Sequence, residues 1–222
     1  MALSNEQIER YSRQIIVPGM GSIGQERLIA AHLVIAGELA DIEPVLAYMA
    51  GAGVGRISLL DPGLISATAA RLIIEQMRDS NPDVAVAAVT AAPADATLLL
   101  AIAGSADALK TASAFCEGRW TGAVVFARLD VPAKLVILPA PAPCLACADA
   151  GLLAPFSPRC ENGGFVAMIA AAESFKLLAG CTPPSRPTLI EFSGYESAAR
   201  ELRVAGDRSR CGCHPKEPGG HR

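Results

Sequence analysis

Residues 32–61 contain the feature that most constrains the fold, because two short apolar runs flank one helical segment. His32–Ala36 and Arg56–Leu60 have the length and composition of buried strands, and the second run ends at Asp61. Residues 43–50 between them have the composition of a helix. A strand, a helix and a second strand at this spacing form a βαβ unit with parallel strands. The segment therefore predicts a parallel sheet covered by helices.

The rest of the chain repeats this alternation and predicts an α/β fold, a Rossmann-like mostly parallel sheet with helices on both faces. The expected helices are a short one capped by Ser4 and the segments 22–31, 67–78, 94–103 and 164–178. The expected further strands are 84–89, 123–126 and 134–138, followed by a hairpin-like segment through 189–192 and 201–204. Residues 104–118 give no clear pattern. We predict one domain, with a helical arm (1–31), a core (32–138) and a C-terminal zinc-knuckle part (139–222).

Composition excludes several classes of function. The chain has 222 residues, 51% of them hydrophobic, so it can bury a substantial core. Its formal net charge of -3 gives no general attraction to nucleic acids or anionic membranes. No apolar stretch reaches the roughly 20 residues of a membrane span, and the polar residues 1–7 do not resemble a signal peptide. We expect a cytoplasmic protein with neither nucleic-acid nor membrane partners.

The cysteine spacing predicts a structural zinc site. Seven cysteines in a cytoplasmic chain favour metal binding or chemistry over disulfides. Two clusters in Pro/Gly-containing loops each offer two soft ligands, as a tetrahedral zinc site requires. The candidate ligands are Cys144, Cys147, Cys211 and either Cys213 or His214. Isolated redox thiols and chance clustering are the alternatives.

The turn after the first strand lacks most of the glycines of a nucleotide-binding loop. It reads Gly-Glu-Leu-Ala-Asp-Ile from residue 37, so only Gly37 remains. Glycine is needed there because a side chain holds the backbone away from the phosphates. Glu38 and Asp41 also place negative charge where phosphate would lie. The loop predicts a nucleotide-binding scaffold whose phosphate site has decayed or been repurposed.

Several motifs in the same order resemble the ThiF/MoeB/HesA family, bacterial relatives of the ubiquitin-activating enzymes. They are residues 10–16 (Arg-Tyr-Ser-Arg-Gln-Ile-Ile), 24–28, 52–61, the paired cysteine clusters and 173–180. The resemblance implies ATP- and Mg²⁺-dependent adenylation of the C-terminal glycine of a small ubiquitin-like sulfur-carrier protein, usually by a homodimer. It also implies that Asp61 binds the ribose hydroxyls and that Arg13 reaches the phosphates across the dimer.

Other residues of the family's site have no counterpart. Only nineteen residues separate Asp61 from Asn81, without the family's asparagine-leucine-x-arginine segment, and Arg71 is the nearest candidate cation. Asp107 stands near the expected position of a metal-binding aspartate, but without its motif. Asp61 would then simply cap the following turn, and Arg13 would form an ion pair at a dimer interface.

Cys160 is the candidate catalytic thiol. It lies after the first cysteine cluster, where some relatives place a thiol that forms persulfide or thioester links, and beside Arg159, which would favour the thiolate. The spacing does not match the family pattern squarely. Cys116 and Cys181 are expected to pack as small hydrophobic residues, and His32 to be a structural histidine with satisfied hydrogen bonds.

Three hypotheses follow. The first is a catalytically impaired dimeric scaffold that bears zinc, binds little or no ATP and Mg²⁺, and recognises a ubiquitin-like sulfur carrier or an active relative. The second is an active adenylyltransferase of a thiamine or molybdenum cofactor type pathway. The third, a dinucleotide oxidoreductase, is disfavoured because it needs the same missing glycines.

Overall fold

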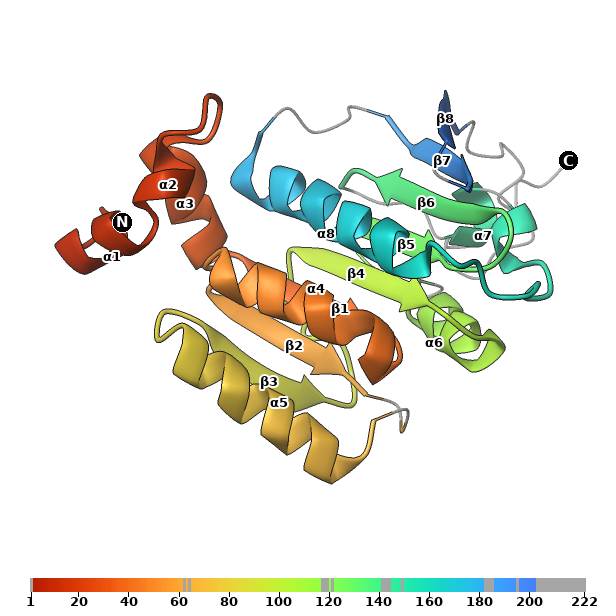
Figure 1. Ribbon diagram of the computed structural model, residues 1–222, viewed down its shortest axis with the longest axis horizontal. Coiled ribbons are helices and arrows are strands. Elements are labelled where there is room, and N and C mark those ends of the chain that lie inside the picture. The colour runs from red at the N-terminus through yellow and green to blue at the C-terminus, as the bar shows by residue number, and fades with distance from the viewer. Residues whose placement is uncertain are drawn as a thin grey trace, which may run out of the picture.

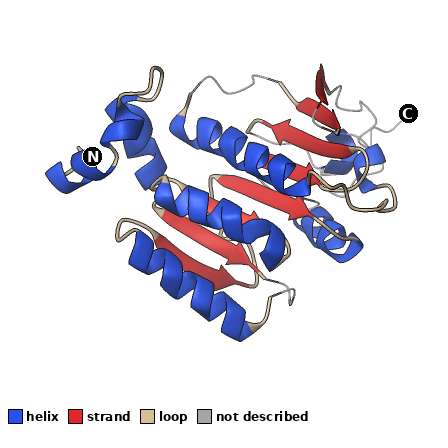
Figure 2. Ribbon diagram, viewed as in Figure 1, coloured by secondary structure: helices blue, strands red, loops and turns tan. Residues whose placement is uncertain are grey.

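An eight-stranded sheet lies at the centre of the protein. The computed structural model describes residues 2–61, 63, 65–116, 120, 122–140, 145–148, 150–181, 186–194 and 196–202, without the side chains of 115, 116, 146, 147 and 150. The strands are β1 (His32–Ala36), β2 (Arg56–Leu60), β3 (Ala85–Val89), β4 (Leu98–Ala103), β5 (Ala123–Arg128), β6 (Ala133–Leu138), β7 (Thr188–Ser193) and β8 (Glu196–Glu201). Their order is β3-β2-β1-β4-β5-β6-β7-β8. The first five strands of this order, β3-β2-β1-β4-β5, pair in parallel. The pairs β5-β6, β6-β7 and β7-β8 are antiparallel (Figure 2).

Helices cover both faces of this sheet (Figure 1). They are α1 (Asn5–Arg10), α2 (Ser12–Ile15), α3 (Gly21–Ala30), α4 (Leu39–Gly51), α5 (Ala67–Ser80), α6 (Ala106–Cys116), α7 (Leu145–Ala148) and α8 (Gly163–Ala179), with a 3₁₀ turn at Ala150–Leu153. Alternate residues of β1 enter separate cores: Leu33 and Ile35 pack with α4, α5 and α8, whereas Val34 and Ala36 pack with α6 and α7. The α/β fold predicted from the sequence is confirmed.

The N-terminal arm, α1 to α3, is attached through a buried tyrosine. Tyr11 is 1% exposed, and its ring lies over Gly53, where a Cβ atom would come within 2.5 Å of it. The Tyr11 hydroxyl accepts from Asn81 Nδ2 at 3.0 Å and donates to Asp83 at 3.0 Å. Arg10 forms an ion pair with the same aspartate. The arm therefore rests on the C-terminal end of α4 and on the loop before β3.

The prediction of a helix at residues 94–103 is wrong. Residues 98–103 form the fully buried central strand β4, and the unassigned segment after it contains α6. Leucine and alanine favour helices in isolation. A continuous apolar run of six residues shows neither helical nor strand periodicity, so its pairing with β1 and β5 decides that it is a strand. The last strand also begins earlier than expected, directly after the turn at Gly194, and residues 203 and 204 lie outside the described residues.

The other elements follow the sequence closely. Ser4 caps α1 in a reciprocal arrangement with Gln7, and Gly180 ends α8 in the left-handed conformation with φ of 74°. Among the described residues, the helices are too short or too polar for any of them to cross a lipid bilayer.

Candidate functional site at the carboxyl ends of β1 and β4

The strand order reverses between β1 and β4, and folds of this kind bind ligands beyond the carboxyl ends of the strands at such a point. Gly37 and Glu38 follow β1, and Gly104 and Ser105 follow β4. The first turn of α4 covers this crevice. The site where the family would hold ATP phosphates is therefore defined by described residues.

An internal ion pair fills this crevice. Asp41, in the first turn of α4, accepts hydrogen bonds from both terminal nitrogens of Arg159, one of them at 3.0 Å. The Asp41 side chain is 2% exposed and that of Arg159 is 46% exposed. A Cβ atom on Gly104 would lie 1.9 Å from Asp41 Oδ2 and 2.5 Å from Arg159 Nη1. The pair thus occupies the space that glycine leaves at the end of β4.

A second contact closes the crevice beside this pair. The Ser105 hydroxyl donates to Glu38 Oε1 at 2.7 Å, and Glu38 makes no capping hydrogen bond to α4. The hydrogen bond to Asp41 raises the pKa of Arg159, so the guanidinium stays charged. Two acidic side chains of the degenerate loop are therefore held in place by residues that follow β4 and precede α8.

Gly37 and Asp61 take structural positions at this edge. A Cβ atom on Gly37 would lie 2.7 Å from the Ile102 carbonyl oxygen, so glycine lets the turn after β1 approach β4 closely. Asp61 Oδ1 accepts the backbone N–H groups of Gly63 at 2.9 Å and of Ile65 at 3.0 Å. Asp61 therefore caps the turn after β2, as the alternative interpretation expected, while its role toward ribose stays a prediction.

Arg13 lies far from the crevice within one chain. It lines a cavity with Gly51 and Ala52 at the C-terminal end of α4, whereas Gly37 precedes the N-terminal end. A helix of 13 residues separates the two ends by roughly 20 Å. Among the described residues Arg13 has no ion-pair partner, so the predicted ion pair would need a second chain. Arg71 is exposed on α5 and Asp107 is exposed in the first turn of α6, paired with Lys110.

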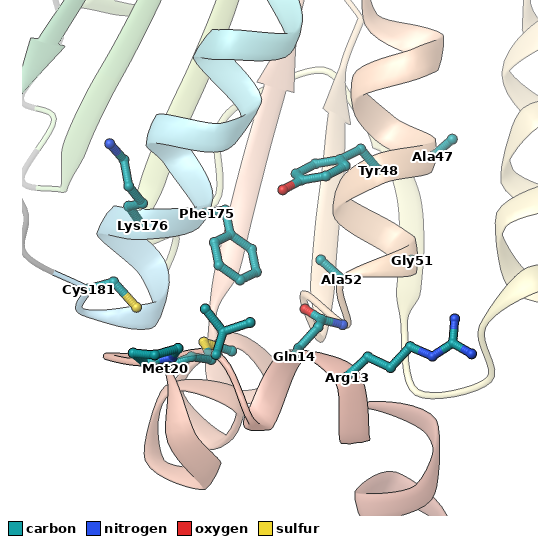
Figure 3. Close-up of a pocket in the computed structure, with 12 residues that line it drawn as sticks. Arg13, Gln14, Met20, Ala47, Tyr48, Gly51, Ala52, Phe175, Lys176 and Cys181 are labelled. Atoms are coloured by element: carbon teal, nitrogen blue, oxygen red, sulfur yellow. The ribbon is translucent and has the colours of Figure 1, made fainter.

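The cavity beside Arg13 has a volume of about 850 Å³ (Figure 3). Its walls come from the loop between α2 and α3 and from the C-terminal ends of α4 and α8. Tyr48 and Phe175 meet there edge to face, with ring centroids 6.4 Å apart. Arg13 and Lys176 are its charged lining residues. This surface is mostly apolar and lies at the end of the sheet opposite the crevice.

Cys160 follows Arg159 beside the crevice, and its thiol is partly buried. Its backbone N–H donates to the Leu129 carbonyl oxygen at 2.8 Å, and its side chain packs against the core. Burial raises the pKa of the Cys160 thiol, and Arg159 offsets this only in part because its guanidinium is bound to Asp41. The raised pKa argues against the expected thiolate, and a catalytic role for Cys160 remains a prediction. Cys181 packs against the core as predicted.

The proposed zinc site cannot be located in the described part of the chain. Cys144, Cys211, Cys213 and His214 lie outside the described residues, as does the side chain of Cys147 in α7. The side chain of Cys116 is also outside them. The described residues contain no group of three or more metal-ligating side chains. The zinc site stays a prediction.

His32 is the structural histidine that the sequence suggested. Its Nε2 lies 2.8 Å from Ser58 Oγ and its Nδ1 lies 3.1 Å from Asp95 Oδ1, an order of groups that resembles a hydrolase triad. Ser58 is 4% exposed in the middle of β2, whose backbone is paired on both sides. A buried serine without free backbone donors lacks both substrate access and an oxyanion hole, so the cluster stabilises the sheet instead.

Two charged pairs were missed by the sequence analysis. Arg159 contacts a residue 118 positions away, which no local pattern reveals. Arg128 and Asp130 form a buried pair at the end of β5. A signal for the latter was present, because two charges directly after an apolar strand and two residues apart can pair at its end.

Comparison with known proteins identifies the family. The vegetative HesA protein of Trichormus variabilis is 30% identical over 252 residues, covering 96% of this chain and 92% of the relative. A molybdopterin-synthase adenylyltransferase of Salmonella typhimurium is 26% identical, covering 91% of this chain and 94% of the relative. The solved structure of E. coli MccB with ATP has a similar fold, with a TM-score of 0.66, 18% identity, and coverage of 92% of this chain and 73% of MccB. No protein-family model matches the chain. With these relatives and its eight-stranded sheet, the chain belongs to the ThiF/MoeB/HesA family.

Proposed function

We propose that this protein is a catalytically impaired member of its family, a dimeric scaffold that binds a ubiquitin-like sulfur carrier or an active relative. The observation that carries the proposal is the Asp41–Arg159 pair, which occupies the space beside Gly104. In an active site of this class the same space would receive phosphate oxygens, and the family's glycines would keep it open. Here it contains a carboxylate and its counter-charge.

Charge and shape both oppose ATP binding. A phosphate near Asp41 would be repelled by the negative charge of its carboxylate. The Asp41 side chain is only 2% exposed, so water screens this repulsion poorly. Moving Asp41 aside requires breaking a bidentate pair with Arg159. Removing one preorganised donor from such a site already costs about 3–4 kcal/mol of transition-state stabilisation. Several cationic residues of the family are absent, so we expect little adenylation.

The surface proposed for a partner is the arm with the adjoining cavity. Ile16 is 78% exposed and Ile23 is 64% exposed, which leaves apolar area on the arm open to solvent. Arg13, uncompensated by any described residue, lies on the same side. These features support association with a second copy, in which Arg13 would find its partner. We also propose that the cysteine clusters hold a structural zinc ion.

The second candidate is an active adenylyltransferase. The observation that favours it is the near full-length similarity to a molybdopterin-synthase adenylyltransferase. In that case ATP and Mg²⁺ would bind after Asp41 moves, and Asp61 would have to exchange its turn contacts for ribose. Its substrate would be the C-terminal glycine of a ubiquitin-like sulfur carrier.

Calorimetric titration of the full chain with ATP and Mg²⁺ separates the two. The scaffold hypothesis expects a dissociation constant weaker than about 1 mM. Saturable, Mg²⁺-dependent binding tighter than this would reject the hypothesis and lead to pyrophosphate-exchange assays with candidate carriers.

A further inference from the structure

We propose that Asp41 is a built-in anion that occupies an anion-binding site formed by Arg159 and Gly104, so that removing its charge lets a diphosphate group bind in its place. The inference rests on the proposed function, since it explains why the crevice is closed. The contact between Asp41 and Arg159 is then autoinhibitory. The Arg159 guanidinium and the space beside Gly104 are present, and the Asp41 carboxylate takes the place of an external anion.

The receiving groups are already arranged around a carboxylate. Both terminal nitrogens of Arg159 face Asp41 in the forked geometry that guanidinium uses for carboxylates and phosphates. Gly104 provides the space, because a Cβ atom there would overlap Asp41 Oδ2. An oxyanion in the position of this carboxylate would meet the same donors.

The backbone that carries Arg159 is held in place independently of Asp41. The segment that carries it forms a bridge with Asp130, and the hydrogen bond from Cys160 N to Leu129 O, 2.8 Å long, fixes the next residue. A further bond joins Val131 N to the Pro158 carbonyl at 3.1 Å. None of these backbone contacts involves Asp41, so we expect the segment that carries Arg159 to stay beside the crevice when Asp41 is replaced.

Ligand access is compatible with this arrangement. The Arg159 side chain is 46% exposed, so one side of the guanidinium already faces water, while Asp41 is enclosed. In the first turn of α4 the backbone N–H groups of Asp41 and Ile42 donate to the Glu38 carbonyl oxygen, so among the described residues those of Leu39 and Ala40 are left for a ligand. Glu38 does not satisfy them, since it accepts from Ser105 and leaves the cap unused. An entering diphosphate would therefore replace the aspartate without rebuilding the fold.

The test uses inorganic pyrophosphate as the probe, titrated into the full chain at fixed ionic strength. An Asp41→Ser variant should bind it at least about tenfold more tightly than wild type, the effect of one charge-assisted contact. The double variant Asp41→Ser/Arg159→Ala should lose this gain. Asp79→Ser, at an exposed position in the last turn of α5, removes the same charge far from the crevice and should match wild type.

Three results would overturn the inference: no gain in Asp41→Ser, an equal gain in Asp79→Ser, or a gain that survives loss of Arg159. Should Asp41→Ser fail to fold by circular dichroism, Asp41→Asn keeps the shape and carries the same prediction of an Arg159-dependent gain. Failure here leaves the scaffold hypothesis standing. Binding of ATP and Mg²⁺ by wild type would instead reject the scaffold hypothesis itself.

Discussion

At the scale of single residues, the buried ion pair of Arg128 and Asp130 fixes the segment that precedes Arg159. Arg128 and Asp130 are 4% and 3% exposed and meet through two hydrogen bonds of 2.6 Å. Arg128 also donates to the carbonyl oxygens of Leu152, Ala154 and Pro155, and Asp130 accepts from Ser157 N. This pair therefore shapes the segment that leads to Arg159. Both charges are therefore engaged in contacts within the protein.

We expect Asp130→Asn to destabilise the protein by about 3 kcal/mol at pH 7, because Arg128 would remain buried without its counter-charge. Burial opposes ionisation of Asp130, but hydrogen bonds from Arg128 and Ser157 N outweigh it, and the pKa of this carboxyl is lowered. The stabilisation is then present above the unfolded pKa of about 4 and is lost as pH falls through the folded value.

Urea unfolding at pH 7 and pH 3 measures this difference. The difference in free energy of unfolding between wild type and Asp130→Asn should be smaller at pH 3 than at pH 7. The control Asp79→Asn, at an exposed position, should differ little from wild type at either pH. An equal gap at both pH values would show that the carboxylate charge is not responsible.

At the scale of secondary-structure elements, Tyr11 is the buried anchor of the first two helices of the arm, α1 and α2, beside the contacts of Gln7 and Arg10 with Asp83. Tyr11 bonds to Asn81 and Asp83 in the loop between α5 and β3, and α1 and α2 bury no residue of their own. Their helices have 6 and 4 residues, too short to be stable alone. The hydroxyl and the ring thus contribute separately: one satisfies Asn81 and Asp83, and the other fills the space over Gly53.

Tyr11→Ala should release the arm, whereas Tyr11→Phe should retain it at a cost of about 1 kcal/mol for the lost hydrogen bonds. Hydrogen exchange of the amides of residues 5–15 is the measurement. Fast exchange in the alanine variant with near wild-type exchange in the phenylalanine variant is expected. Similar protection in both variants would assign the docking to other contacts.

The sequence predicted most elements because their patterns are local. Ser4 and Gly180 mark helix ends through their own side chain or conformation, and β1 and β2 matched their predicted bounds. Residues 98–103 failed because a central strand is defined by its neighbours. In the site, Gly37 and Asp61 were placed at the correct sheet edge. The occupant of the crevice was not predictable, since Asp41 and Arg159 meet only in the folded chain.

At the scale of the whole molecule, apolar surface is concentrated on the arm. The exposed apolar side chains there are Ile8, Ile16, Val17 and Ile23. Of these, Val17 lines the cavity that also contains Tyr48 and Phe175. Together these surfaces support the proposed dimer, which would also supply the missing partner for Arg13.

Ile16→Glu should weaken self-association at least about tenfold, since a buried charge would oppose contact. Sedimentation velocity over a concentration series measures the effect. Leu72→Glu, at a position 56% exposed on α5, is the matched control and should associate like wild type. A wild-type protein that remains monomeric at the highest concentration would contradict the dimer, as would equal weakening by both variants.

The docking of Tyr11 also sets an order of events during synthesis. Asn81 follows Tyr11 by 70 residues, so the arm leaves the ribosome well before the loop that receives it. At the usual elongation rate of about 5–20 residues per second, this delay lasts several seconds. During this time the Tyr11 hydroxyl has neither of its native hydrogen-bond partners. Tyr11 is thus synthesised before the residues that fix its place, so it can dock only after the loop at residues 81–84 has left the ribosome.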